Sequence, residues 1–187
     1  MGGQVSSTQR RGRLAAIRGV ERQERLAIRG QALYSARIVP LHRPGAGAGS
    51  ARSDAAYLIT GGLGALGCLM AEHLKRRGAG TIVLCGRNPA GPAVAAGIER
   101  LRDDKTQVVV MQGDVSQDAD VRRMLARIKT TLPGLKGIIH AAGVLDDGII
   151  RDQTWERFAR VMAPKVDGAW HLHRHTRDLG LDFFILF

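Results

Sequence analysis

The chain has 187 residues, of which 44% are hydrophobic and 4% aromatic, and it carries a formal net charge of +11 at pH 7. This composition excludes a wholly disordered chain, and the length suits one domain with a sizeable core rather than two full domains. No apolar run approaches the roughly 20 residues that span a bilayer, so we expect no membrane-spanning segment. Two cysteines, Cys68 and Cys85, cannot build a disulfide framework, which favours a reducing, cytoplasmic setting.

The positive charge is concentrated near the N-terminus. Residues 1–52 contain ten arginines against Glu21 and Glu24, which accounts for +8 of the +11. One interpretation is a contact with nucleic acid or an anionic surface. We favour a solvated connecting segment, because no series of aromatic residues for base stacking and no nucleic-acid-binding motif accompanies the arginines. We therefore expect neither a nucleic-acid partner nor a membrane partner.

Composition divides the chain into four segments. Residues 1–23 form a basic arm that we expect to be disordered. Within residues 24–43, short apolar stretches on either side of Gly30 predict a strand, a turn and a second strand. Residues 44–55 are a low-complexity linker rich in Gly, Ala and Ser, and residues 56–187 have the composition of a folded domain.

From residue 56 onward, predicted strands and helices alternate. Strands are expected at residues 57–60, 81–85, 108–111, 137–141 and 183–187. Helices are expected at residues 66–78, 93–101 and 119–128, with one long helix through residues 155–169. The strands are apolar throughout rather than alternating, as in a parallel sheet covered on both faces. The pattern predicts an α/β fold with a Rossmann-type, doubly wound parallel sheet.

Two groups of side chains lie in or just after the predicted long helix. Trp155, Phe158 and Met162 recur at helical spacing, which we interpret as core packing. Of three nearby histidines, only His171 and His175 share a helix face, and no third ligand is evident, whereas zinc requires three or four. We interpret the histidines as a polar helix end and expect no metal site.

Four glycines lie between the first strand of the domain and its first helix: Gly61, Gly62, Gly64 and Gly67. At that position the chain must turn sharply, admit a pyrophosphate and pack a helix against the sheet, and each need favours a residue without Cβ. The helix N-terminus then offers N–H groups to a phosphate. Cys68, not Lys, follows the last glycine, which disfavours a nucleoside triphosphate-hydrolysing loop.

The ends of the next two strands indicate which dinucleotide would bind. Twenty residues after Gly67, where an NAD site usually places an acid on the ribose 2′-hydroxyl, the sequence has Arg87. A guanidinium pairs well with a 2′-phosphate, so NADP(H) is favoured over NAD(H). Asp114, after the third strand, can accept a hydrogen bond from the adenine amino group. Surface side chains at strand ends are the alternative for both residues.

Several motifs together resemble the ketoreductase domain of type I modular polyketide synthases, within the short-chain dehydrogenase/reductase superfamily. They occur in the family's order and spacing: Thr60-Gly-Gly-Leu-Gly-Ala-Leu-Gly67, Gly113-Asp-Val115, His140-Ala-Ala-Gly143, Leu145-Asp-Asp147 and Lys165-Val-Asp-Gly168. The resemblance covers about residues 24–187. It implies that residues 24–43 end a small structural subdomain and that residues 56–187 form the NADP-binding half of the domain.

The resemblance implies NADPH-dependent reduction of a β-ketoacyl thioester, carried on an acyl carrier protein, to the β-hydroxyacyl thioester. In the family a Tyr supplies the proton, a Ser orients the carbonyl, and a Lys, here Lys165, lowers the pKa of the Tyr. The implied stereocontrol residues are Leu145, Asp146 and Asp147, typical of the class that gives the D-configured hydroxyl. The implied cofactor-binding residues are Thr60, Gly61, Gly62, Leu63, Gly64, Leu66, Gly67, Arg87, Asp114, Val115, Ala141, Ala142 and Gly143.

The chain departs from the family pattern at its end. The catalytic Ser follows the fifth strand in the family and the Tyr comes about a dozen residues later, but the sequence ends at Phe187 on that strand and has no Tyr after Tyr57. We therefore expect a fragment, truncated after the fifth strand, whose status as an enzyme is uncertain and which is inactive alone. A complementary C-terminal segment and the remaining synthase domains are the implied partners. The alternative is a non-catalytic NADP(H)-binding module acting with a partner chain.

Overall fold

The computed structural model describes residues 26–30, 32–35 and 51–187, which fall into two units, one within residues 1–47 and the other within residues 48–187. In the first unit, β1 (Leu26–Arg29) and β2 (Ala32–Ser35) form an antiparallel hairpin. The turn includes Gly30 at φ 61°, a conformation that glycine adopts without strain. The strand–turn–strand prediction is thus confirmed between residues 26 and 35. The predicted basic arm, and the predicted linker up to residue 50, lie outside the described residues.

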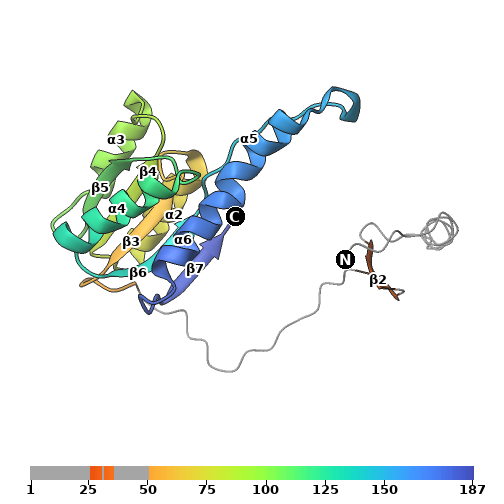
Figure 1. Ribbon diagram of the computed structural model, residues 1–187. Coiled ribbons are helices and arrows are strands. Elements are labelled where there is room, and N and C mark those ends of the chain that lie inside the picture. The colour runs from red at the N-terminus through yellow and green to blue at the C-terminus, as the bar shows by residue number, and fades with distance from the viewer. Residues whose placement is uncertain (1–25, 31, 36–50) are drawn as a thin grey trace, which may run out of the picture. The chain divides into compact units, whose positions relative to one another are not determined.

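The second unit contains one five-stranded parallel sheet and its covering helices (Figure 1). The strands are β3 (Ala56–Thr60), β4 (Thr81–Gly86), β5 (Gln107–Gln112), β6 (Leu135–His140) and β7 (Phe183–Leu186). The helices are α2 (Ala65–Arg76), α3 (Pro92–Leu101), α4 (Asp118–Thr131), α5 (Trp155–Lys165) and α6 (Asp167–Thr176), with a short 3₁₀ helix at Ile150–Asp152. The strand order is β5-β4-β3-β6-β7, and every pair is parallel. The predicted doubly wound α/β fold is confirmed.

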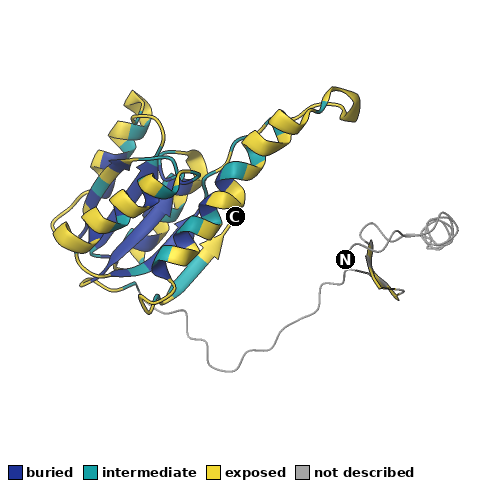
Figure 2. Ribbon diagram, in the orientation of Figure 1, coloured by how far each residue is buried: buried dark blue, intermediate teal, exposed yellow. Residues whose placement is uncertain are grey.

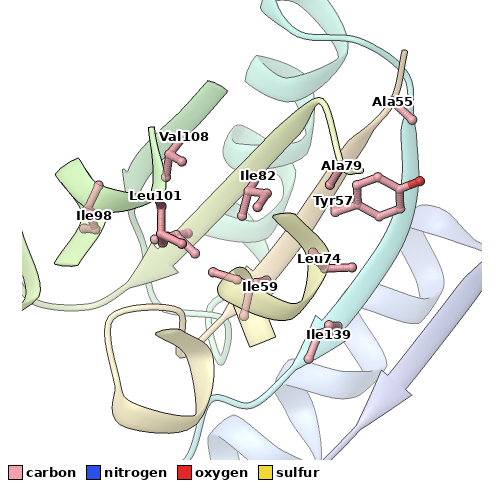
Figure 3. Close-up of a cluster of buried hydrophobic side chains, with 12 residues drawn as sticks. Ala55, Tyr57, Ile59, Leu74, Ala79, Ile82, Ile98, Leu101, Val108 and Ile139 are labelled. Atoms are coloured by element: carbon pink, nitrogen blue, oxygen red, sulfur yellow. The ribbon is translucent and has the colours of Figure 1, made fainter. Parts of the chain in front are cut away.

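Each face of the sheet has its own apolar core, because the central strands are buried on both sides (Figure 2). On one face, Leu74 of α2 and Leu101 of α3 pack onto side chains of β3 and β4 such as Ile59 and Ile82 (Figure 3). On the other face, α4 and α6 cover the remaining side chains, and Leu172 of α6 is completely buried there. Two covered faces explain why the central strands are continuously apolar in sequence.

An aromatic pair joins β3 to β7 across the intervening strand β6. Tyr57, Gly137 and Phe183 stand side by side in the register of the three strands. The rings of Tyr57 and Phe183 stack with centroids 5.6 Å apart and planes 11° apart. A Cβ at Gly137 would lie 2.7 Å from Cδ1 of Tyr57, so a residue with a side chain would displace the ring. Glycine at this position lets the two rings meet.

Three expectations about this domain are wrong. The edge strand β5 is not covered on both faces, since Val108 and Met111 are its buried residues and the others are partly or fully exposed. The predicted long helix is two helices that meet at Val166, two residues after Pro164, whose ring nitrogen cannot donate a helical hydrogen bond. α5 extends beyond the sheet (Figure 1). In consequence Trp155, Phe158 and Met162 are 78%, 53% and 51% exposed, and none of the three is a core residue.

No helix in the described ranges is both long enough and apolar enough to cross a membrane.

Candidate functional site

The carboxyl ends of the parallel strands meet at one edge of the sheet. The strand order reverses between β3 and β6, and ligands of such sheets bind in the crevice at that position. A pocket opens there, lined by Gly61, Cys85, Gly86, Arg87, Gly113, Asp114, Val115, Ala142, Gly143 and Pro164. The pocket therefore brings together residues from four of the strand ends that the sequence analysis singled out.

The glycine loop leaves β3 and enters α2 with almost no free space. Gly61 has φ 67°, and a Cβ there would lie 2.6 Å from the carbonyl oxygen of Ala141. A Cβ at Gly67 would lie 2.5 Å from Cα of Gly62, so α2 begins directly against the loop. These two glycines allow the loop to contact both the turn after β6 and its own helix.

The N-terminus of α2 suits an anion. The first intrahelical bond runs from the N–H of Cys68 to the carbonyl of Gly64, 2.9 Å away, so the amides that precede Cys68 in the first turn have no helical acceptor. The first turn of α2 also contains no acidic residue. Free amides and the positive end of the helix dipole fit a dinucleotide pyrophosphate.

Arg87 follows β4 at the rim of the pocket. Its main-chain oxygen accepts a hydrogen bond from Nε2 of Gln112 at 2.8 Å, which ties the end of β4 to the end of β5. Its side chain is exposed, and among the described residues no carboxylate pairs with the guanidinium. An unpaired guanidinium at this strand end fits a phosphate group rather than a ribose hydroxyl.

Asp114 follows β5 and lines the same pocket. Its Oδ1 accepts two hydrogen bonds from Ser116, from the N–H at 2.9 Å and from Oγ at 2.8 Å. Its own N–H donates to Oδ2 of Asp120 at 2.9 Å. Asp120 was not singled out by the sequence analysis, because an acid in the first turn of a helix is an ordinary feature of helices.

His140, at the end of β6, is buried and joins three segments. Thr60 Oγ1 lies 2.6 Å from its Nδ1, and the carbonyl of Pro164 lies 2.8 Å from its Nε2. Burial lowers the pKa of the imidazole, and Lys165 lowers it further. A Cβ at Gly168 would lie 3.3 Å from the ring, so α6 approaches closely. The sequence analysis placed His140 in a motif but did not predict that it links two other segments. A histidine at the end of an apolar strand could have indicated a buried, hydrogen-bonded side chain.

Lys165 is the last residue of α5 and lies against the end of the sheet. Its Nζ donates to the main-chain oxygen of Phe187 at 2.6 Å. A Cβ at Gly143 would lie 3.0 Å from its Cε. The ammonium group therefore lies between the end of β7 and the turn after β6, beside the pocket that Gly143 lines.

The Leu145-Asp146-Asp147 segment lies apart from that pocket and lines a second one with Arg157. The carboxylate of Asp146 pairs with Arg157 and, at 3.1 Å, with Arg160. The hydrogen bond and charge of Arg157 lower the pKa of Asp146. Leu145 is 90% exposed. Arg157 is a further residue that the sequence analysis missed, since nothing in the spacing links it to Asp146.

The three histidines of the metal hypothesis have different surroundings. Nδ1 of His171 lies 3.1 Å from the carbonyl of Val115, and Nε2 of His175 lies 2.7 Å from Oδ1 of Asp118. The ring of His173 lies 5.6 Å from that of Trp170. Within residues 51–187 and the hairpin, no three His, Cys, Asp or Glu side chains are grouped to hold a metal. His171 and His175 instead tie α6 to α4 and to the loop before it.

The parallel sheet, with a glycine loop at its switch point, defines a Rossmann-type α/β domain. A model of the KR domain family matches residues 55–187, which include the whole of that sheet. The chain belongs to this family, the ketoreductase domains of polyketide synthases within the short-chain dehydrogenase/reductase superfamily. The resemblance seen in the sequence is confirmed.

Curated relatives include large polyketide synthases from mycobacteria. The chain is 44% identical over 137 residues to a mycocerosic acid synthase-like polyketide synthase of Mycobacterium tuberculosis, covering 73% of this chain and 6% of that protein. It is 40% identical over 136 residues to a phthioceranic/hydroxyphthioceranic acid synthase of Mycobacterium bovis, with the same coverage. The chain thus spans about 6% of the length of these relatives.

Solved structures agree with the family. A ketoreductase domain from the bacillaene assembly line matches with TM-score 0.75 and 34% identity, over 95% of this chain and 42% of that one. The ketoreductase from the first module of phoslactomycin biosynthesis in Streptomyces sp. HK803 matches with TM-score 0.71 and 31% identity, over 88% of this chain and 38% of that one.

Proposed function

We propose that residues 56–187 form the NADPH-binding half of a ketoreductase site, and that residues 24–43 end the structural subdomain before it. One observation carries the cofactor assignment: a single pocket is lined by Gly61 of the glycine loop, by Asp114 and by Arg87, whose guanidinium pairs with no carboxylate in the described part of the chain. The glycine loop and the N-terminus of α2 bind the pyrophosphate. Arg87 binds the 2′-phosphate, and Asp114 accepts a hydrogen bond from the adenine amino group.

NADPH, when bound, supplies hydride to a carbonyl carbon. The small residues after β6, Ala141, Ala142 and Gly143, allow the nicotinamide ribose to approach the backbone. Lys165 holds a positive charge beside that turn, and this charge would stabilise the anionic form of a phenol brought next to it and lower the pKa of that phenol. The buried His140 fixes the distance between the turn and α5 through the carbonyl of Pro164.

Neither tyrosine of the printed sequence supports the role of proton donor to these residues. Tyr57 opens β3, at the opposite edge of the sheet from Lys165, and its hydroxyl accepts a hydrogen bond from the N–H of Arg52 at 2.6 Å. Tyr34 belongs to the hairpin of the other unit. We therefore expect a polypeptide of these 187 residues to bind the cofactor and to have no meaningful ketoreductase activity, since loss of acid–base catalysis alone costs about 10²–10⁴ in rate.

The wider assignment rests on the family. We propose a β-ketoacyl thioester on an acyl carrier protein as the substrate, the other domains of a cytoplasmic polyketide synthase as partners, and a C-terminal ketoreductase segment as the source of the Ser and Tyr. The exposed Leu145 and the anchored Asp146 belong to the loop that sets the stereochemistry. A non-catalytic NADP(H)-binding module acting with a partner chain is the second candidate, and the pocket that Gly61, Arg87 and Asp114 line supports cofactor binding under this candidate too.

The test is equilibrium binding to the full 187-residue chain. NADPH fluorescence should change on binding and should be reversed by 2′,5′-adenosine diphosphate, which contains the phosphate that Arg87 is proposed to bind. 5′-Adenosine monophosphate, which lacks the 2′-phosphate, should displace NADPH poorly. Failure of the folded chain to bind NADPH at millimolar concentration would contradict the proposal. Recovery of ketoreduction on adding a C-terminal ketoreductase segment separates the first candidate from the second.

A further inference from the structure

We infer that Asp120 is a positioning residue that sets adenine specificity by holding Asp114 in its hydrogen-bonding orientation. The inference rests on the proposed function, because Asp114 matters in this way only if the pocket takes an adenine dinucleotide. Asp120 lies in the first turn of α4, outside the pocket lining, and acts only through the loop that precedes this helix.

The contact between the two aspartates is direct. Oδ2 of Asp120 accepts the N–H of Asp114 at 2.9 Å. Oδ2 and Cβ of Asp120 also lie 3.7 and 3.8 Å from the position a Cβ would take at Gly113. The carboxylate therefore fills the space beside the peptide that joins Gly113 to Asp114, and it fixes the plane of that peptide.

The side chain of Asp114 is fixed from its other side. Oδ1 accepts both the N–H and the Oγ hydrogen of Ser116. Among the described residues, no hydrogen bond reaches Oδ2 of Asp114. With its N–H held by Asp120 and its Oδ1 held by Ser116, Asp114 lines the pocket and keeps its second carboxylate oxygen available as an acceptor. An exocyclic amino group is the matching donor, and adenine carries one.

The charge on Asp120 is compensated, which allows two carboxylates to lie close together. Oδ1 of Asp120 pairs with Arg123 at 2.6 Å, one turn along α4. The bond from the Asp114 N–H, followed by Arg123, lowers the pKa of Asp120, so this acceptor is ionised at neutral pH. A charged acceptor binds an N–H more strongly than a neutral one.

Helix stabilisation is the simpler role for an acid at this position, and the chain provides a matched control for it. Asp118 occupies the same first turn of α4. It pairs with Arg122 and lies against His175, and its carboxylate makes no hydrogen bond to Asp114. Both acids interact favourably with the helix dipole, but only Asp120 bonds to the loop. Replacing each in turn separates the two effects.

The experiment measures binding of NADPH and of its reduced hypoxanthine analogue, in which a carbonyl oxygen replaces the adenine amino group, to the full chain. The wild type should bind NADPH about tenfold more tightly than the analogue, because one hydrogen bond to a charged acceptor contributes about that much affinity. Asp120→Ala should lower that ratio to about twofold, mainly by weakening NADPH binding. Asp118→Ala should leave the ratio unchanged. Asp120→Asn, whose amide oxygen can still accept the Asp114 N–H, should keep most of the preference for NADPH over the analogue.

The outcomes are distinguishable. If the wild type binds neither dinucleotide, the proposed function fails, and the inference fails with it. If the wild type discriminates and Asp120→Ala keeps the full ratio while losing only thermal stability, Asp120 is structural and the inference alone is overturned. Circular dichroism confirms folding of each variant. If Asp120→Ala does not fold, Asp120→Ser replaces it, because serine is accepted in a first helical turn and its hydroxyl is too short to reach the loop.

Discussion

The Nε2 of His140 donates a hydrogen bond to the carbonyl of Pro164 at 2.8 Å. A carbonyl can only accept, so Nε2 carries the proton, and Nδ1 is free to accept from the hydroxyl of Thr60 at 2.6 Å. The neutral imidazole thus satisfies both partners inside a buried site. The residue joins the ends of β3 and β6 to the helix that carries Lys165.

The neutral state of His140 predicts how stability depends on pH. Burial lowers its pKa from the usual 6.5, so the unfolded chain takes up a proton at a higher pH than the folded chain. The stability that the neutral histidine contributes is therefore complete above about pH 6.5 and is lost as pH falls through the folded-state pKa. The unfolding midpoint in urea should fall as the pH is lowered from 7 to 5.5.

Two comparisons isolate His140 in that titration. His140→Gln should flatten the dependence, whereas His173→Gln, at an exposed position, should not. The acids whose pKa is lowered, including Asp103, Asp118 and Asp146, lose their contribution only below about pH 4. An unchanged slope in His140→Gln would show that the imidazole does not report the transition.

Gly61 should tolerate no side chain. With φ 67° and the carbonyl oxygen of Ala141 only 2.6 Å from where a Cβ would lie, Gly61→Ala combines backbone strain with a clash. We expect a loss of about 2–4 kcal/mol in the free energy of unfolding, measured by urea denaturation. Gly134→Ala is the control, since a Cβ there meets nothing within 4 Å; its effect should be within about 1 kcal/mol. Equal effects of the two substitutions would contradict this account of the loop.

The ion pair between Arg157 and Asp146 should hold the Leu145–Asp147 loop in place. Arg157→Ala removes the pair and three bonds to main-chain oxygens, of Asp146 at 3.3 Å, of Asp147 at 2.9 Å and of Asp152 at 3.1 Å. Hydrogen exchange of residues 144–149 should become about tenfold faster or more, which corresponds to loss of about 1.4 kcal/mol of local stability. Arg160→Ala, which removes a more exposed contact, should have a smaller effect. Unchanged exchange in Arg157→Ala would show that the loop is held by other contacts.

The sequence predicts the fold well because the central strands are buried on both sides and are bounded by glycines. Continuous apolar runs such as residues 81–85 could be read directly as a covered parallel sheet, and each of the five strands lies where it was expected. The helical face was misread at Trp155 and Phe158. Helical spacing indicates that a face is apolar, but not whether another element covers it, and α5 extends beyond the sheet.

The pocket residues were predictable for the same reason, since glycines and polar residues at the ends of parallel strands must gather at one edge. The supporting contacts were not predictable. Asp120 and Asp114 are six residues apart, and Arg157 and Asp146 are eleven apart, and both pairs depend on the path of a loop. The bond from His140 to the carbonyl of Pro164 depends on how closely α6 packs at Gly168. No periodic pattern encodes such distances.

The effect of Arg87 on the preference for NADPH over NADH is the most direct test of the proposed cofactor site. Dissociation constants of NADPH and NADH should be measured for the full chain, for Arg87→Ala and for Arg100→Ala, an exposed arginine outside the pocket lining. The account predicts that the wild type and Arg100→Ala prefer NADPH by about tenfold or more, and that Arg87→Ala binds the two dinucleotides about equally, through weaker NADPH binding. Equal affinity in the wild type, or a preference that survives in Arg87→Ala, would contradict it.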